Sequence, residues 1–398
     1  MSAAPPLSLY VHLPWCVSKC PYCDFNSHVA GARADRDRYL DALVADLAGE
    51  AERAAGRPVA SVFLGGGTPS LFTAAQIGSL LEAVGARLAV TADAEVTMEA
   101  NPGTVERGRL ADYRAAGVNR LSLGVQSFDD GALRRLGRIH GAADAVAACR
   151  EAQAAGFAAV NLDLMYALPG QTVAAALADL RQAVALDPAH LSWYELTLEP
   201  NTRFFACPPP DLPGEDEALA IERAGLALLA EAGYQRYEIS AFARPGLRCR
   251  HNLNYWRFGD YLGVGAGAHG KLTDPAGGIW RRVKPAHPRA YMERMEAGGA
   301  VPATRVADGE IAFEYMLNAL RLLDGFSEAE FVARTGLCFA AVAPIVAGLR
   351  RNGLMEPAGS GAWRPSPRGF ALLNDLQAAF LTRPGAAPAP PAPVQAQV

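Results

Sequence analysis

The chain of 398 residues is 51% hydrophobic and is long enough for one large domain and a smaller one. Its formal net charge of −4 gives no indication of a nucleic-acid partner, and none is expected. No apolar run approaches the roughly 18–20 residues needed to span a bilayer, and the N-terminal residues do not resemble a signal peptide. We therefore expect a cytoplasmic protein, with peripheral membrane contact and homodimer formation left open.

Apolar runs alternate with amphipathic segments from residue 7 to about residue 240. The predicted strands are 7–13, 61–66, 95–100, 120–126, 159–166 and 191–198, and the predicted helices include 35–54, 74–88, 104–115, 142–155 and 173–186. Gly117, Gly156 and Gly233 each precede a strand, at a point where a left-handed backbone can end a helix. These repeats predict an α/β fold, a partial (β/α)6 TIM-like barrel, although the spacing alone leaves a doubly wound sheet open.

The chain changes character after the predicted barrel. We expect a barrel at 1–245, a connecting region at 246–304, a smaller and mostly helical domain at 305–382, and a disordered Pro/Ala-rich tail at 383–398. The pattern of the third segment, three helices followed by a turn and a last helix, is winged-helix-like. Winged helices often bind DNA, but the charge balance here favours a packing or lid role.

Three cysteines crowd one short loop directly after the first predicted strand. Cys16, Cys20 and Cys23 have the spacing C-x3-C-x2-C. Three thiolates can hold three irons of a [4Fe–4S] cluster and leave the fourth iron open, and an open iron can bind S-adenosylmethionine (SAM) through its amino and carboxylate groups. A zinc site completed by His28 or His12 is the alternative, but zinc sites normally pair two close cysteines with a second pair farther along the chain. The other four cysteines are scattered, which suggests a reducing compartment.

Further residues that could bind a ligand or take part in catalysis lie where the predicted strands end. The active sites of barrels lie at the carboxyl ends of their strands, so these residues are expected to share one site with the cysteines. Glycines let the backbone approach a ligand and leave N–H groups free for a carboxylate or hydroxyl. The residues are Gly66, Gly67 and Thr68 after the second strand, Glu99 on the third, Gln126 on the fourth and Asp163 on the fifth.

Several of these polar residues have a plainer interpretation. Glu99 can accept hydrogen bonds from ribose hydroxyls or the amino group of SAM, or it can be a carboxylate near the N-terminus of the next helix that the helix dipole stabilises. Arg138 can face the same site or lie as a solvated charge at a helix end. Asp163 lies in an apolar run and therefore needs a partner or a ligand. Tyr10, on the first strand, is either a core residue or a contact of the methionine part of SAM.

A second motif, HNLNYW, begins at His251 and contains Tyr255 and Trp256. A neutral imidazole is a common axial ligand of haem iron, and aromatic rings flanked by arginines suit a macrocycle that carries carboxylates. The alternative is a histidine that caps a helix beside two packed aromatic residues. His269 follows shortly after the motif and has no assigned role.

Six motifs in the order YVHLPWCVSKCPYC, LGGGTPS, EANPG, LSLGVQSF, DLMYALPGQT and RHNLNYW cover about residues 8 to 270. Together they resemble the radical SAM superfamily and, within it, the oxygen-independent coproporphyrinogen III oxidase-like group. The resemblance implies a [4Fe–4S] cluster on the three cysteines. It also implies that SAM is contacted by Tyr10, Tyr22, Gly66, Gly67, Thr68, Glu99, Gln126, Arg138 and Asp163.

Two departures favour a different branch of that group. Phe25 stands where the oxidases have a further cysteine, and only nine residues precede Tyr10, where the oxidases have a longer segment. Phe25 and HNLNYW resemble the HemW-type branch of haem chaperones. This implies haem as cargo with His251 as its candidate ligand, and recipient haemoproteins as partners, with respiratory ones among the candidates. The branch also implies that oxidative decarboxylation of coproporphyrinogen III, the alternative function, is absent.

Overall fold

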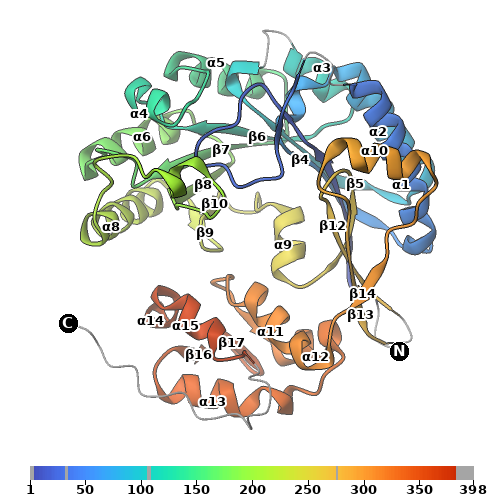
Figure 1. Cartoon of the computed structure of the whole chain (residues 1–398). Helices are drawn as coiled ribbons and strands as arrows, with labels where there is room; N and C mark the ends of the chain where they lie inside the picture. The colour runs from blue at the N-terminus through green and yellow to red at the C-terminus, as the bar shows by residue number, and fades with distance from the viewer. Residues whose placement is uncertain (1–3, 32–34, 105–108, 275–276, 382–398) are drawn as a thin grey trace.

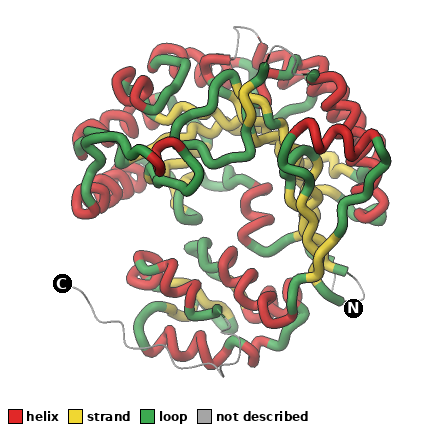
Figure 2. The backbone as a smooth tube through the Cα atoms, in the orientation of Figure 1, coloured by secondary structure: helices red, strands yellow, loops and turns green. Residues whose placement is uncertain are grey.

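The computed structural model describes residues 4–31, 35–104, 109–274 and 277–381 (Figure 1). One large curved sheet with helices outside it occupies the N-terminal part, and a smaller module from the C-terminal part lies across its open side (Figure 1, Figure 2). Among the described residues no helix is both long and apolar enough to cross a bilayer.

The predicted strands form the parallel centre of this sheet. Their order in space is their order along the chain, so each strand lies beside the next instead of the order reversing as in a doubly wound sheet. The partial-barrel prediction is therefore confirmed. The strands are β1 (Leu7–Leu13), β4 (Val59–Gly66), β5 (Val90–Ala100), β6 (Arg120–Gln126), β7 (Ala159–Tyr166) and β8 (His190–Glu195).

Amphipathic helices cover the outer face of the sheet (Figure 1). They are α1 (Arg36–Ala54), α2 (Ala74–Arg87), α3 (Arg109–Ala115), α5 (Ala142–Ala154), α6 (Val173–Ala185) and α8 (Glu215–Glu231). Thr73 and Gln76 form a capping box that fixes the start of α2. Gly117, Gly156 and Gly233 have positive φ, as predicted for glycines that end helices. Residues 105–108 of the predicted 104–115 helix lie outside the described residues.

The sheet extends beyond the predicted strands at both edges. β11 (Asp260–Val264) pairs in parallel with β1, and three antiparallel strands continue from it: β12 (His269–Thr273), β13 (Ile279–Val283) and β14 (Ala303–Arg305). β10 (Ala241–Ala243) and β9 (Gln235–Arg236) extend the other edge beyond β8. α9 (Arg250–Trp256), which carries the HNLNYW motif, lies on the inner side of the curved sheet (Figure 1). α10 (Pro288–Glu296) packs against α1.

The loop that carries the cysteines runs between two short paired strands, β2 (Trp15–Cys16) and β3 (His28–Val29). Two short helices complete the rim of the barrel: α4 (Asp130–Arg135) follows β6, and α7 (Arg203–Ala206) follows β8. The backbone N–H of Phe204 in α7 donates to the carbonyl of Pro21, so the cysteine loop is tied to the far side of the rim.

The C-terminal module combines helices with a three-stranded sheet, as a winged-helix-like domain should. The helices are α11 (Asp308–Ala319), α12 (Glu328–Thr335), α13 (Ala343–Arg351), α14 (Pro367–Ala371) and α15 (Leu373–Ala378), and the strands are β15 (Phe326–Ser327), β16 (Met355–Pro357) and β17 (Ala362–Pro365). Its separate core centres on Tyr315, Phe326 and Phe331. The three boundaries between the four predicted segments stay a prediction, and the predicted tail at 383–398 lies outside the described residues.

Candidate functional site

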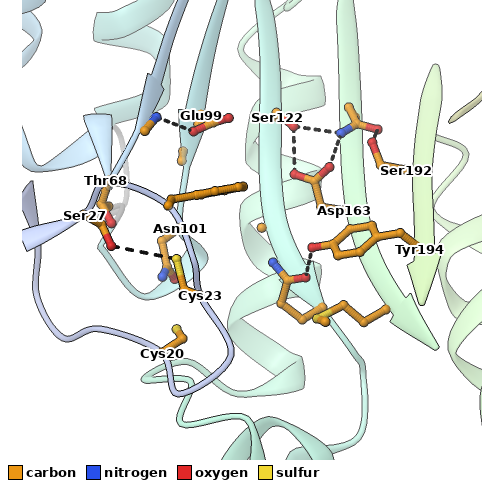
Figure 3. Close-up of a pocket in the computed structure, with 18 of the residues that line it drawn as sticks. Cys20, Cys23, Ser27, Thr68, Glu99, Asn101, Ser122, Asp163, Ser192 and Tyr194 are labelled. Carbon is orange, nitrogen blue, oxygen red and sulfur yellow. Dashed lines mark hydrogen bonds between the residues drawn. The ribbon is translucent and has the colours of Figure 1, made fainter. Parts of the chain in front are cut away.

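A cavity of about 460 Å³ opens at the carboxyl ends of the barrel strands, beneath the cysteine loop (Figure 3). Its size suits a small-molecule ligand. Cys16, Cys20 and Cys23 all line it, so the loop and the strand ends form one site, as the sequence predicts. We call it the barrel cavity.

The three thiols are half-buried and each has a polar neighbour. The Thr68 hydroxyl donates to Cys16 Sγ at 3.5 Å, and the Arg138 guanidinium donates to Cys20 Sγ at 3.5 Å. The Ser27 hydroxyl lies 3.8 Å from Cys23 Sγ (Figure 3). Donors placed against sulfur favour the thiolate, which is the form that binds metal.

The donor set fits a shared iron–sulfur cluster better than a single zinc ion. In the described part of the chain, no three His, Cys, Asp or Glu side chains lie close enough together to hold one metal ion. Ligands of a cube bind different irons and stand farther apart. Burial raises the pKa of the Cys16 and Cys23 thiols, so positive iron beside them would restore the thiolate form. The residues present therefore fit a [4Fe–4S] cluster.

The glycine turn packs against the cysteine loop, and its N–H groups are not free. Gly66, which has φ +114°, donates to Glu99 Oε2 at 3.0 Å, and Gly67 donates to the Leu13 carbonyl at 2.8 Å. Thr68 donates to the Trp15 carbonyl at 2.7 Å. The expectation of free N–H groups is thus wrong in this structure. A Cβ at residue 67 would lie 2.6 Å from the Trp15 oxygen, so glycine allows the close approach of loop and strand.

Glu99 is the carboxylate nearest to the glycine turn. Burial raises its pKa to about 7; the hydrogen bond from Gly66 opposes this shift and the charge of Asp163 adds to it. Thr97, two residues earlier on the same face of β5, lines the cavity, and its buried hydroxyl has no partner among the described residues. The site therefore presents a carboxyl group that titrates near neutrality and an unpaired hydroxyl.

Asp163 has the partners that the sequence required. Its oxygens accept from the Ser122 hydroxyl at 2.8 Å and from the Asn161 amide at 2.7 Å (Figure 3). The Ser192 hydroxyl donates to the other end of the Asn161 amide at 3.2 Å. Burial still raises the pKa of Asp163, because these bonds compensate only in part for lost solvation.

Gln126 and Arg138 close the cavity on the β6 side. Gln126 ends β6 at a bulge with φ +70°, a conformation that non-glycine residues seldom adopt, and its amide oxygen accepts from the Tyr194 hydroxyl at 2.7 Å. Arg138 donates to the Gly124 carbonyl at 2.6 Å, and its Nε has no partner in the described chain. Tyr22 lies beside them in the cavity wall.

Sequence reasoning missed a set of polar residues on the inner faces of the last three strands: Arg120, Ser122, Asn161, His190, Ser192 and Tyr194. Successive side chains of a strand alternate between faces, so every second residue of β6, β7 and β8 points into the barrel. The alternation of polar with apolar residues in these strands was the available signal. It makes the interior a continuous hydrogen-bonding surface.

Two predicted residues lie elsewhere. Tyr10 does not line the barrel cavity; its hydroxyl donates to His12 Nδ1 at 2.9 Å, and its ring borders a second cavity. His251 is 1% exposed and lines neither cavity. Its Nδ1 lies 3.0 Å from the Ser61 hydroxyl and its Nε2 lies 3.0 Å from the Tyr255 hydroxyl, and burial lowers its pKa to about 3. The structure therefore leaves His251 no ring nitrogen free for iron.

Comparison with known proteins agrees with this geometry. The sequence pattern of the radical SAM superfamily matches residues 10–183. The solved structure of coproporphyrinogen III oxidase (HemN) from Escherichia coli, a radical SAM enzyme, superposes with a TM-score of 0.80 at 27% identity, over 95% of this chain and 90% of that one. The fold and the cysteine site thus define a radical SAM protein.

Relatives that match over their full length identify the family within the radical SAM proteins. The chain is 49% identical to the haem chaperone HemW of Escherichia coli and 47% identical to that of Haemophilus influenzae, over 96% of this chain and 100% of each relative. It is 41% identical to the mitochondrial radical S-adenosyl methionine domain-containing protein 1 of Bos taurus, over 76% of this chain and 70% of that protein. The chain belongs to the HemW family.

Proposed function

We propose that this protein is a haem chaperone, which binds haem and delivers it to recipient haemoproteins. The observation that carries the proposal is full-length similarity to HemW proteins at 49% and 47% identity, compared with 27% to the coproporphyrinogen oxidase structure. Free thiols throughout the described chain suit a reducing, cytoplasmic compartment. Respiratory haemoproteins are the recipients that we would test first.

The barrel cavity is proposed to hold the cofactors. Cys16, Cys20 and Cys23 would hold the [4Fe–4S] cluster, which supplies one electron for reductive cleavage of SAM when both are bound. Arg138 and Thr68, which donate to two of the sulfurs, would stabilise the thiolates.

SAM would occupy the remaining space of the barrel cavity. Eight of the predicted SAM-contacting residues line it: Tyr22, Gly66, Gly67, Thr68, Glu99, Gln126, Arg138 and Asp163. Glu99 would accept from the amino group of SAM, and the polar network around Asp163 would meet ribose or adenine atoms. Tyr10 would not contact SAM directly and would instead orient His12 through its hydrogen bond.

A coproporphyrinogen III oxidase remains the competing function because the solved oxidase shares the fold. The side chain of Phe25 is evidence against the oxidase function. The side chain is 60% exposed and lines both the barrel cavity and the second cavity, so an apolar ring occupies the position where the oxidases carry a cysteine. A ring there favours contact with an apolar ligand, but supplies no thiol for chemistry.

An anaerobic assay separates the two functions. The reconstituted protein is titrated with haem, mixed with the haem-free form of a b-type cytochrome, and separately incubated with coproporphyrinogen III, SAM and a reductant. We expect stoichiometric haem binding, appearance of the cytochrome spectrum and no vinyl-bearing product. Formation of protoporphyrinogen IX would refute the chaperone proposal.

A further inference from the structure

A second cavity, of about 660 Å³, lies between the barrel and the C-terminal module. We call it the interdomain groove. It shares Phe25, Gly66 and Glu99 with the barrel cavity, so the two spaces adjoin. The far end of the interdomain groove is lined by residues of strands β11–β13 and of helices α9 and α11.

One wall of the interdomain groove is a face of the extended sheet. Tyr261 on β11 and Arg281 on β13 both pair with Lys271 on β12, so these three side chains share a face. His269 stands two residues before Lys271 on the same strand and therefore lies on that face too. All four residues line the groove.

His269 is exposed, and its imidazole makes no hydrogen bond within the described chain. Partial burial and the charge of Arg281 lower its pKa, which keeps the ring neutral around pH 7. A neutral imidazole with a free nitrogen is the form that ligates iron. Tyr261, Lys271 and Arg281 on the same face are already engaged, with Arg281, Asp260 and Glu314 respectively.

A second wall, which meets the first where the Tyr255 and Tyr261 rings touch, is aromatic and apolar. Tyr255 and Trp256 line it from α9, and the buried Trp256 Nε1 has no acceptor among the described residues. Leu317 on α11 and Phe25 add large apolar side chains that are 43% and 60% exposed. Exposed apolar groups gathered in one groove indicate a ligand with flat, apolar faces.

His251 is buried next to this wall and supports Tyr255. Its Nε2 lies 3.0 Å from the Tyr255 hydroxyl and its ring packs edge-on against the Tyr255 ring, with centroids 4.8 Å apart. The carboxylate of Glu95 accepts from the backbone N–H of His251, so the start of α9 is also fixed. The motif HNLNYW thus presents its tyrosine and tryptophan to the groove and keeps its histidine inside.

From these observations we propose that the interdomain groove is the haem site and that His269, rather than His251, is the axial ligand of the iron. This inference rests on the proposed chaperone function and assigns it a place. The macrocycle would lie against the side chains of Tyr255 and Trp256. His251 is then a positioning residue that orients Tyr255.

The test is a haem titration of the reconstituted full-length protein, followed by resonance Raman spectroscopy of the ferrous complex, in which an iron–histidine stretching band reports an imidazole ligand. For His269→Ala we expect the band to disappear and the dissociation constant to rise at least about tenfold, with added imidazole restoring the band. His287→Ala is the matched control: this histidine is exposed and does not line the groove, so both readouts should stay as in the unmodified protein.

His251→Phe separates the two histidines. Phenylalanine keeps the packing against Phe63 and Tyr255 but removes the hydrogen bonds, so we expect weaker haem binding with the iron–histidine band retained. Circular dichroism and SAM binding confirm the fold of each variant. A band that persists in His269→Ala, or one lost in a folded His251→Phe, would overturn the inference while leaving the chaperone function intact. An unmodified protein that binds no haem would instead refute the proposed function itself.

Discussion

The barrel cavity and the interdomain groove adjoin, yet they are built on opposite principles. In the barrel cavity many polar side chains bond to one another, as Asp163 does with Ser122 and Asn161. In the groove, aromatic and aliphatic surfaces remain exposed and His269 has no partner among the described residues. A pre-organised polar site suits a small zwitterion that is held in one orientation, whereas an open apolar groove suits a flat ligand that must leave again.

Loss of the cluster should be the largest effect and should affect only the barrel cavity. Cys20→Ala removes one of three iron ligands, so we expect iron content to fall from about four per chain to near zero and the brown cluster absorbance to vanish. The cysteine loop lies outside the barrel strands, and the thermal unfolding midpoint should therefore change little. Iron analysis, visible absorbance and haem titration after anaerobic reconstitution provide the measurements.

Cys207→Ala is the matched control for that variant. Cys207 is an exposed thiol at the end of α7 and does not line the barrel cavity, so its loss should leave the iron content unchanged. If Cys20→Ala lost haem binding as completely as it lost iron, the two cavities would not be separate sites.

The polar network gives the second contrast. Asp163→Ala leaves the Ser122 hydroxyl and Asn161 amide without their acceptor, at a cost of about 1.5–3 kcal/mol for a bond to a charged group. We expect the SAM dissociation constant to rise about 10- to 100-fold while haem affinity stays unchanged. Calorimetric titration of the anaerobic protein measures both. Equal SAM affinity in a folded Asp163→Ala variant would place SAM away from this network.

The sequence predicted these two regions unequally, and the reason is physical. The first parallel strands and the cysteine loop are local patterns: β1 is buried along almost its whole length and reads as an apolar run, and Cys16 to Cys23 lie in one segment. The glycines that end helices were likewise visible as single residues with a steric role. Such features need no knowledge of distant contacts.

The interdomain groove depends on distant contacts instead. β11 pairs with β1 across some 250 residues of chain, and its short sequence, DYLGV, carries no strong strand signal. The side of α9 that His251 occupies is decided by Ser61 and Glu95, which belong to other strands. A motif shows which residues occur together but does not show which of them faces the ligand. This is why His251 was predicted as a ligand and the structure places it inside.

The aromatic wall offers a third way to separate the cavities. Trp256→Ala removes a ring held by Arg321 at 4.1 Å, together with the contact area it offers to a planar ligand. We expect about a tenfold loss of haem affinity and no change in SAM affinity. Trp363→Ala, in the C-terminal module and outside the groove, is the control for loss of a tryptophan. Comparable haem loss in both variants would indicate general destabilisation of the module rather than a contact with haem.

The smallest expected effect is a pH dependence confined to the barrel cavity. Burial is the main cause that raises the pKa of Glu99 to about 7. In the free protein, the carboxyl group therefore gains a proton as the pH falls below 7. The amino group of SAM keeps N–H donors when its nitrogen binds iron, and these donors bind better to the ionised carboxylate than to the protonated acid. SAM affinity should therefore rise between pH 6 and pH 7.5, by up to about tenfold per unit below the pKa. Glu99→Gln should flatten this profile, and haem affinity should not follow it. A profile that Glu99→Gln leaves unchanged would show that another group accepts from the amino group.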